Sequence, residues 1–317
     1  MAEIPVETPL VRAFEVWVPN RSRSALRFTS GFYRGYATGP GDLDVEVAVG
    51  QGLPGQVLER RRPVILEDLT AFRGFLRPEV AAESGFSAGV GFPVLRRGVV
   101  RAVVTLLFAT PEDAIGAYEI WTADAARQRL AWSDGYYGDL DAFGAVSRET
   151  TFAFGEGIPG QVAQSEGPVL FHSLTAEAGF VRSEVAAEAG LSAGLGLPIS
   201  GADAVEQVVL LLTSSSTPLA RVMEVWRPNG RGTLHLSAGY YGPLDGFAEV
   251  SRQTTFRTGV GLPGRVYQSK APVVFERLTA EAGFVRSAAA ARSGLQAALG
   301  VPVFHGGRVR AVVVLFN

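Results

Sequence analysis

Gly259-Val-Gly-Leu-Pro-Gly264 is the stretch that decides the fold, because the chain contains it three times. The earlier copies read Gly50-Gln-Gly-Leu-Pro-Gly55 and Gly155-Glu-Gly-Ile-Pro-Gly160, at an interval of about 105 residues. Solenoid repeats run about 20 to 50 residues, so this interval is too long for one. It suits a small domain with its own core. The chain is therefore one type of domain in triplicate.

Three further motifs keep the same order in every copy. A Glu-x-Trp pair comes first, a Gly-aromatic-Tyr follows, and a Phe-x-Arg lies near the end. From these motifs we place the three domains at residues 9–108, 112–213 and 218–317.

The composition excludes several classes of protein. The 317-residue chain has a formal net charge of −2 and no basic block, which argues against nucleic acid or an anionic membrane surface as the main partner. No apolar run is long enough to span a bilayer, and the start does not read as a secretory signal, so we expect a cytoplasmic protein. Cysteine is absent, which excludes thiol catalysis, disulfides and thiolate metal sites.

Hydrophobic periodicity in the third copy predicts an α+β domain. Residues 220–226 alternate as the first strand of a hairpin, and we interpret residues 239–258 as a long, partly ordered loop. The glycine motif begins a short helix with Pro263 in its first turn. A strand, a second helix around Phe284 and a closing hairpin complete the order ββ-loop-αβαββ. Each copy is thus a sandwich-like domain, a mostly antiparallel sheet with short helices and the long loop on one face.

This succession of motifs resembles a GAF domain over nearly the whole of each copy. The resemblance rests on the glycine motif, the Phe-x-Arg, a later Gly-x-Pro-Val strand and a closing apolar strand. GAF domains usually carry terminal helices that cover the back of the sheet. Here only about nine residues separate one copy from the next, and Asn317 directly follows the last strand. We therefore expect a neighbouring repeat, a second chain or a partner protein to cover these apolar faces.

The resemblance also implies a ligand cavity between the sheet and the long loop. Aromatic walls with one arginine and one hydroxyl would suit a planar or anionic small molecule. In the alternative, the same aromatics are core residues, and the arginines only tie the loop to a helix end or to a nearby Asp141 or Asp245. The implied pocket residues are Tyr137, Phe143, Thr151, Phe180 and Arg182 in the second copy, and Tyr241, Phe247, Thr255, Phe284 and Arg286 in the third.

Catalytic residues, metal ligands and cofactors find no support in the sequence. The three histidines, His172, His235 and His305, fall at non-equivalent positions without ligand spacing. The glycine motif lacks the lysine and hydroxyl of a phosphate-binding loop, so we interpret it as a tight turn into a helix. Without cysteine, the bilin linkage and the methionine sulfoxide reductase chemistry of some GAF domains are excluded.

The tryptophans of the Glu-x-Trp pairs have an unusual environment. Each shares a strand face with a glutamate, which predicts a half-buried face or a contact with the next repeat. We interpret Trp17, Trp121 and Trp226 as interface anchors.

Two functions stay open. In the first, the protein is a non-catalytic regulatory sensor that binds a small molecule in the second and third copies and relays the signal to a separate signalling or effector protein. In the second, the pockets hold no ligand, and the triplet is a scaffold for protein–protein interaction or oligomerisation, including homodimerisation. No output domain is recognisable, so in both cases we expect the signal to leave through another protein.

Overall fold

Each repeat builds one six-stranded antiparallel sheet, and the strand order is the same in all three. The computed structural model describes residues 9–34, 45–69, 85–109, 114–175, 179–201 and 204–317. In the first domain the order across the sheet is β3-β2-β1-β6-β5-β4. The α+β class and the mostly antiparallel sheet are therefore confirmed. None of the helices within these ranges is long and apolar enough to cross a membrane.

The elements of each domain follow one another in the same way along the chain. The first domain contains β1 (Val11–Pro19), β2 (Ala25–Tyr33), β3 (Glu46–Ala48), α1 (Gly52–Arg60), β4 (Val64–Leu66), β5 (Ala88–Arg96) and β6 (Val99–Phe108). The second contains β7 (Gly116–Ala123), β8 (Arg129–Tyr136), α3 (Asp141–Glu149), β9 (Thr151–Ala153), α4 (Gly157–Ser165), β10 (Val169–Phe171), α5 (Ser183–Glu188), β11 (Ala193–Ser200) and β12 (Val205–Thr213). The third contains β13 (Val222–Pro228), β14 (Thr233–Tyr240), α6 (Asp245–Gln253), β15 (Thr255–Arg257), α7 (Gly261–Ser269), β16 (Val273–Phe275), α8 (Ser287–Arg292), β17 (Ala298–His305) and β18 (Arg308–Phe316).

The segment expected as a long loop is ordered. In the third domain residues 239–258 contain helix α6 and the edge strand β15. The buried face of α6 consists of Phe247, Ala248 and Ser251, which is one short stripe on a helix of nine residues. So brief an amphipathic signal is too weak to be recognised between glycine-rich flanks.

The glycine motif is a tight turn into a helix, as predicted. In the third copy Gly259 and Gly261 have φ values of +82° and +61°, which favour glycine, and the amide of Gly259 donates to the carbonyl of Gly264 at 2.8 Å. A Cβ on Gly264 would lie 2.2 Å from the carbonyl oxygen of Arg257. Each glycine is therefore needed by the backbone, and the same geometry recurs in the other two copies.

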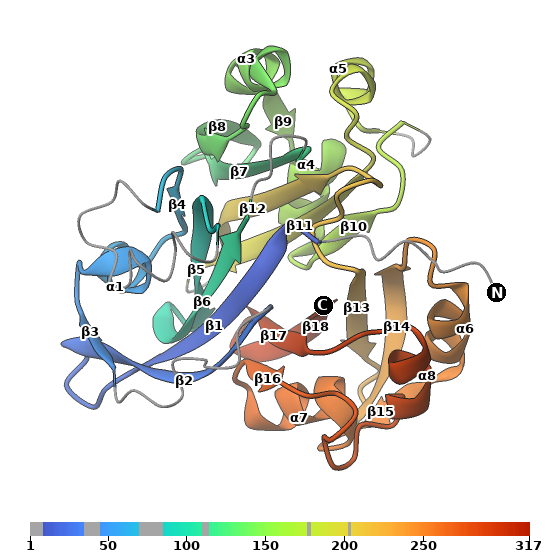
Figure 1. Ribbon diagram of the computed structural model, residues 1–317. Coiled ribbons are helices and arrows are strands. Elements are labelled where there is room, and N and C mark those ends of the chain that lie inside the picture. Colours follow the sequence, from blue (N-terminus) through green and yellow to red (C-terminus); the bar gives the residue numbers. More distant parts are fainter. Residues whose placement is uncertain (1–8, 35–44, 70–84, 110–113, 176–178, 202–203) are drawn as a thin grey trace.

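The three sheets pack back to back around an approximate threefold axis (Figure 1). Strands β5, β11 and β17 meet at this axis, where equivalent segments, 92–95, 197–200 and 301–304, line an apolar cavity of about 30 Å³. The helices lie on the outer faces of the sheets (Figure 1). Neighbouring repeats thus cover the apolar backs that would otherwise lie open.

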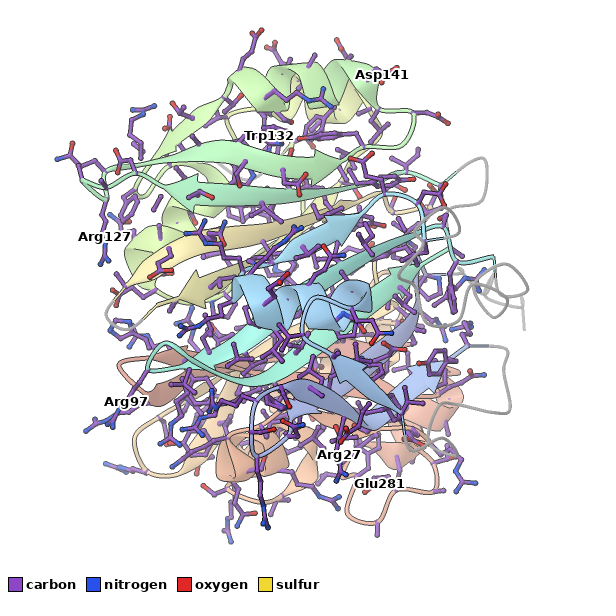
Figure 2. The ribbon with its side chains drawn as sticks, turned by 90° about the vertical axis from the view of Figure 1, so that its left-hand side faces the viewer. Arg27, Arg97, Arg127, Trp132, Asp141 and Glu281 are labelled. Atoms are coloured by element: carbon purple, nitrogen blue, oxygen red, sulfur yellow. The ribbon has the colours of Figure 1, made fainter. Side chains whose placement is uncertain are left out.

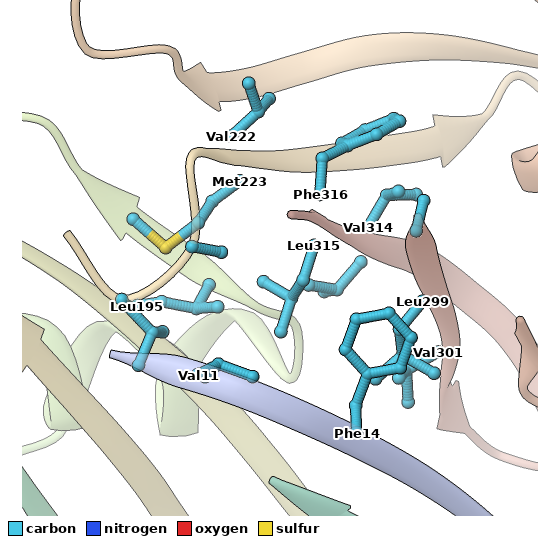
Figure 3. Close-up of a cluster of buried hydrophobic side chains, with 14 of the residues drawn as sticks. Val11, Phe14, Leu195, Val222, Met223, Leu299, Val301, Val314, Leu315 and Phe316 are labelled. Carbon is cyan, nitrogen blue, oxygen red and sulfur yellow. The ribbon is translucent and has the colours of Figure 1, made fainter. Parts of the chain in front are cut away.

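The ring of domains closes through the ends of the chain. The amides of Leu10 and Val11 donate to the carbonyls of Pro218 and Leu219 at 2.8 and 3.0 Å, and the side-chain amide of Asn317 donates to the Val11 carbonyl at 2.6 Å. Side chains of β1, β11, β13, β17 and β18 share one buried cluster (Figure 3). The first strand is therefore packed directly against the third domain.

Candidate functional site

The second domain contains a buried acid–arginine cluster between its sheet and helices α3 and α5. Glu119 and Trp121 come from β7, and Tyr137 directly follows β8. Ser147 lies on α3, and Arg182 is the residue that caps the start of α5. Residues from four segments that are far apart in the sequence thus converge on one carboxylate.

Arg182 and Glu119 form a bidentate ion pair. Arg182 Nη1 donates to Glu119 Oε1 at 2.6 Å, and Nη2 donates to Oε2 at 2.9 Å. The side chains are 1% and 0% exposed. Nη1 also donates to Ser147 Oγ, while Trp121 Nε1 and the Tyr137 hydroxyl donate to the carboxylate at 2.9 and 3.1 Å. The carboxylate is therefore saturated with donors, which is the condition under which a buried charge is tolerated.

The electrostatics of this cluster agree with an ionised acid. Burial alone would raise the pKa of Glu119, but the charge of Arg182 and the hydrogen bonds to the carboxylate outweigh it and lower that pKa. Burial, followed by the charge of Glu119, raises the pKa of the Tyr137 hydroxyl. At neutral pH the carboxylate is charged and the phenol keeps its proton, so each hydrogen bond in the cluster has a defined donor.

The third domain repeats the cluster with the same partners. Arg286 Nη1 and Nη2 donate to Glu224 Oε1 and Oε2 at 2.5 and 2.9 Å, and Nη1 also donates to Ser251 Oγ. Trp226 Nε1 and the Tyr241 hydroxyl donate to the carboxylate at 2.8 and 3.1 Å. Both members of the ion pair are 0% exposed.

The first domain keeps the acid, the tryptophan and the tyrosine but adds a hydroxyl. Trp17 Nε1 and Thr105 Oγ1 donate to Glu15 Oε2 at 2.8 and 2.7 Å, and the Tyr33 hydroxyl donates to Oε1. Thr105 pairs with Glu15 across the strands, a register position that Leu210 and Val314 occupy in the other two domains. Arg77 of the first Phe-x-Arg lies outside the described residues.

The structure brings most of the sequence-predicted pocket residues together. The guanidinium carbon of Arg182 lies 4.6 Å from the ring centre of Phe143 and 5.7 Å from that of Phe180. In the third domain the ring centre of Phe247 lies 4.7 Å from the Arg286 guanidinium, and the Phe316 ring also contacts this guanidinium. The ring of Phe284 is 6.4 Å from that of Phe316. Aromatic faces thus enclose both cations.

The two threonines lie elsewhere. Thr151 is exposed on β9 at the edge of the sheet, where its hydroxyl accepts from Arg129 Nη2 at 2.6 Å. Thr255 occupies the equivalent exposed position on β15. The hydroxyl that joins each cluster instead comes from a serine, Ser147 or Ser251, which the sequence interpretation placed in the loop.

The tryptophans lie inside their own domains rather than between repeats. Trp17, Trp121 and Trp226 are 2%, 0% and 0% exposed, and each donates to the glutamate two residues before it. The rings of Trp121 and Trp226 also pack edge-on against Phe152 and Phe256 at 4.7 Å. This corrects their interpretation as interface anchors. In the second and third domains the glutamate can be buried because an arginine about 60 residues away in sequence neutralises its charge.

One N–H donor of Arg182 and one of Arg286 lack a hydrogen-bond acceptor among the described residues. The Nε atoms of Arg182 and Arg286 are buried and have no hydrogen-bond partner among the described residues. Buried unpaired N–H groups are uncommon, and each costs about 1–3 kcal/mol. Within the same residues no group of three or more histidine, aspartate or glutamate side chains could hold a metal ion.

The sequence contained a signal for the glutamate that pairs with each arginine, which the sequence analysis did not identify. Glu-x-Trp and Phe-x-Arg recur together in every copy, so an acid and an arginine always accompany each other. Asp141 and Asp245, the candidate partners from sequence, instead begin α3 and α6, where an acid stabilises the first turn.

Comparison with known proteins identifies the type of domain. Residues 204–317 match the GAF domain family. No curated protein matches the chain. Similar solved structures include the GAF domain of A. aeolicus nlh2, with 22% identity, a TM-score of 0.27, and coverage of 31% of this chain and 58% of that one.

Two further solved structures cover similar portions. The GAF domain of the Acinetobacter phosphoenolpyruvate-protein phosphotransferase is 19% identical, with a TM-score of 0.25, over 32% of this chain and 58% of that one. The fRMsr of Staphylococcus aureus is 14% identical, with a TM-score of 0.25, over 32% and 59%. The chain thus covers under two thirds of each of these solved structures.

The family match and the repeated architecture lead to one conclusion. The matched segment contains the whole of the third domain, and the other two domains repeat its motifs and its strand order. GAF domains are in general regulatory and ligand-binding domains. The chain is a protein of three tandem GAF-like domains.

Proposed function

We propose that the protein is a non-catalytic regulatory scaffold that presents three GAF-like domains as one unit to a partner protein. One observation carries this proposal. The arginines that the GAF resemblance assigns to ligand pockets are already occupied, because Arg182 and Arg286 each form a buried bidentate pair with a glutamate of the same domain.

The energetics of these pairs oppose a ligand that simply replaces the acid. An anion approaching Arg182 would have to displace Glu119, and that carboxylate would then be buried without its partner. Breaking a buried ion pair in this way costs about 3–5 kcal/mol. The pairs therefore act as structural ties between the sheet and the helices.

The titration behaviour of the cluster supports its non-catalytic character. A carboxylate that accepts several hydrogen bonds and has a lowered pKa is a weak general base. A phenol with a raised pKa keeps its proton at neutral pH. Ser147 Oγ donates to the Phe143 carbonyl at 2.7 Å and accepts from Arg182, so its proton is held by a backbone carbonyl rather than by a general base.

A second candidate function is small-molecule sensing at the same clusters in domains 2 and 3, with relay to a separate effector protein. The unpaired buried Nε atoms of Arg182 and Arg286 favour it, because a ligand acceptor would complete their hydrogen bonding. Binding would then require α3 and α5, or α6 and α8, to move apart from the sheet.

Native mass spectrometry of the full chain tests both functions. The scaffold predicts the bare mass of the chain, alone or as a multiple if copies associate. A matched variant, Arg286→Met, should likewise show only the bare mass calculated for its own sequence. Extra mass that disappears on denaturation, and that decreases in Arg286→Met, would contradict the scaffold and support the sensor.

A further inference from the structure

Three equivalent contacts between domains lie at one end of the molecule. At each contact the hairpin of one domain faces the C-terminal end of a helix in a neighbouring domain. The β11–β12 hairpin faces α1, the β17–β18 hairpin faces α4, and the β5–β6 hairpin faces α7. Arg97 marks the tip of the β5–β6 hairpin at the left-hand edge of Figure 2.

Two of these contacts place a carboxylate beside basic side chains. Glu206, on the β11–β12 hairpin, shares a cavity with the three arginines 60–62 at the end of α1. His305 Nε2, on the β17–β18 hairpin, lies 3.0 Å from Glu166 Oε2 at the end of α4. In both contacts a carboxylate faces basic side chains.

The third contact brings like charges together. The β5–β6 hairpin and α7 border a groove of about 790 Å³. Among the residues that the structure describes, no carboxylate lines this groove. Its cationic lining residues are Arg96, Arg97, Lys270, Arg308 and Arg310, and His305, which pairs with Glu166, also lines it.

The repeat shows why the acids are missing. Lys270 follows α7 in the left-handed conformation, and the same position after α4 is Glu166. Arg310 precedes Ala311 on β18, and the strand register places Glu206 at the same position on β12. The third domain thus has cations at the two positions where the second domain has acids.

Contacts between the first and third domains form the walls of this groove. Arg96 Nε donates to the Gly307 carbonyl at 3.2 Å, and the Arg97 side chain lies against Gly307. Tyr267, Pro228 and Val309 supply part of the wall. Burial, together with the positive charge of Arg310, lowers the pKa of neighbouring Arg227, so the cations of this region act on one another.

We propose that this groove between the first and third domains binds a small polyanion that carries phosphate groups. Guanidinium and ammonium groups form charge-assisted hydrogen bonds with phosphate oxygens. The volume is that of a typical small-molecule site, and the Tyr267 side chain adds an aromatic surface beside the cations. This site is separate from the buried Glu–Arg clusters and does not depend on how they function.

Such a ligand would act on the assembly of the ring. Domains 1 and 3 are not consecutive in the chain, so their contact depends on packing and hydrogen bonds alone. A polyanion that bridges Arg96 and Arg97 to Lys270 and Arg310 would stabilise this contact. Ligand binding to the folded state should then raise the melting temperature.

Isothermal titration calorimetry at low ionic strength tests the proposal, with inorganic pyrophosphate, ATP and adenosine as probes and the full chain as the protein. Pyrophosphate and ATP should bind, and adenosine should not. Arg310→Glu copies the residue of the second domain and should lower the affinity at least about tenfold, since it removes one charged contact and adds a repulsion. Arg127→Glu, at an exposed arginine in the β7–β8 turn of the second domain that does not line the groove, is the control and should leave the affinity unchanged.

The probes also distinguish two kinds of ligand. Tighter binding of ATP than of pyrophosphate would mean that the groove takes a nucleotide, with its base on the aromatic side. Equal affinities would mean that the phosphates alone are recognised. Absence of millimolar binding by both anions overturns the proposal. Equal losses in Arg310→Glu and Arg127→Glu, with circular dichroism confirming that both variants are folded, overturn it too.

Discussion

At the scale of single residues, the buried Glu–Arg pairs determine how the helices are held on the sheet. A buried carboxylate and guanidinium are tolerated only when the donors of one group align with the acceptors of the other. The bidentate pairs in domains 2 and 3 have this alignment. Their aromatic surroundings exclude water, which strengthens the pair and makes removal of one partner costly.

Loss of one arginine should therefore destabilise the protein. Arg286→Met leaves Glu224 buried without its cation, and we expect a loss of about 3–5 kcal/mol in the free energy of unfolding. Urea denaturation followed by circular dichroism measures it. Arg252→Met is the control, because its pair with Glu249 is more than half exposed and contributes little. Equal stability of the two variants would show that the buried pair has no structural role.

Acid should weaken the cluster in the second domain. The pKa of Glu119 is lowered on folding, whereas the unfolded chain has an ordinary value of about 4.3. The stabilisation is thus fully present above that ordinary value and is lost as the pH falls through the lowered native value. The stability advantage of the wild type over Glu119→Gln, measured by urea denaturation from pH 7 to pH 3, should be constant down to about pH 5 and then shrink. An advantage independent of pH would contradict the ionised carboxylate.

At the scale of the elements, the glycine motif sets the angle at which each helix leaves its edge strand. The third glycine of the motif allows the first turn of the helix to touch the backbone of that strand. The sequence predicted this turn correctly because glycine and proline act locally. Helix α6 was missed because its buried stripe is short and its ordering depends on packing against Phe316 and Arg286.

A methyl group in this turn should be poorly tolerated. Gly264→Ala would place Cβ 2.2 Å from the Arg257 carbonyl oxygen, so the backbone must shift, and we expect a loss of about 1–3 kcal/mol. Gly246→Ala is the matched control. Its Cβ would meet nothing within 4 Å, and alanine favours a helix by up to about 1 kcal/mol. Thermal melts should therefore move in opposite directions, and a melting temperature unchanged by Gly264→Ala would contradict the close contact.

At the scale of the whole molecule, three sheets share one central core. Their apolar backs, which terminal helices cover in GAF domains generally, are covered by one another (Figures 1 and 3). The ring closes where the first strand meets the third domain and Asn317. Each domain thus depends on both of its neighbours for burial.

A single domain should not be a stable monomer. Residues 218–317 alone would expose the back of β13, β17 and β18, including Val301, Val303 and Val313, which are at most 6% exposed in the full chain. An apolar face of this kind drives association. Size-exclusion chromatography with light scattering should find trimers or larger species for this fragment, beside a discrete particle for the full chain. A folded monomeric fragment would contradict the shared core.

The amino-acid sequence by itself determined the triplicate organisation, the α+β class and the tight turn of the glycine motif. These follow from repeats, periodicity and local backbone preference, which depend only on residues close together in the sequence. Only the tertiary structure decided that Glu119 pairs with Arg182, that Trp121 lies inside its domain and that the sheets cover each other's backs. Those contacts join residues far apart in sequence, and their stability depends on burial, which no local pattern specifies.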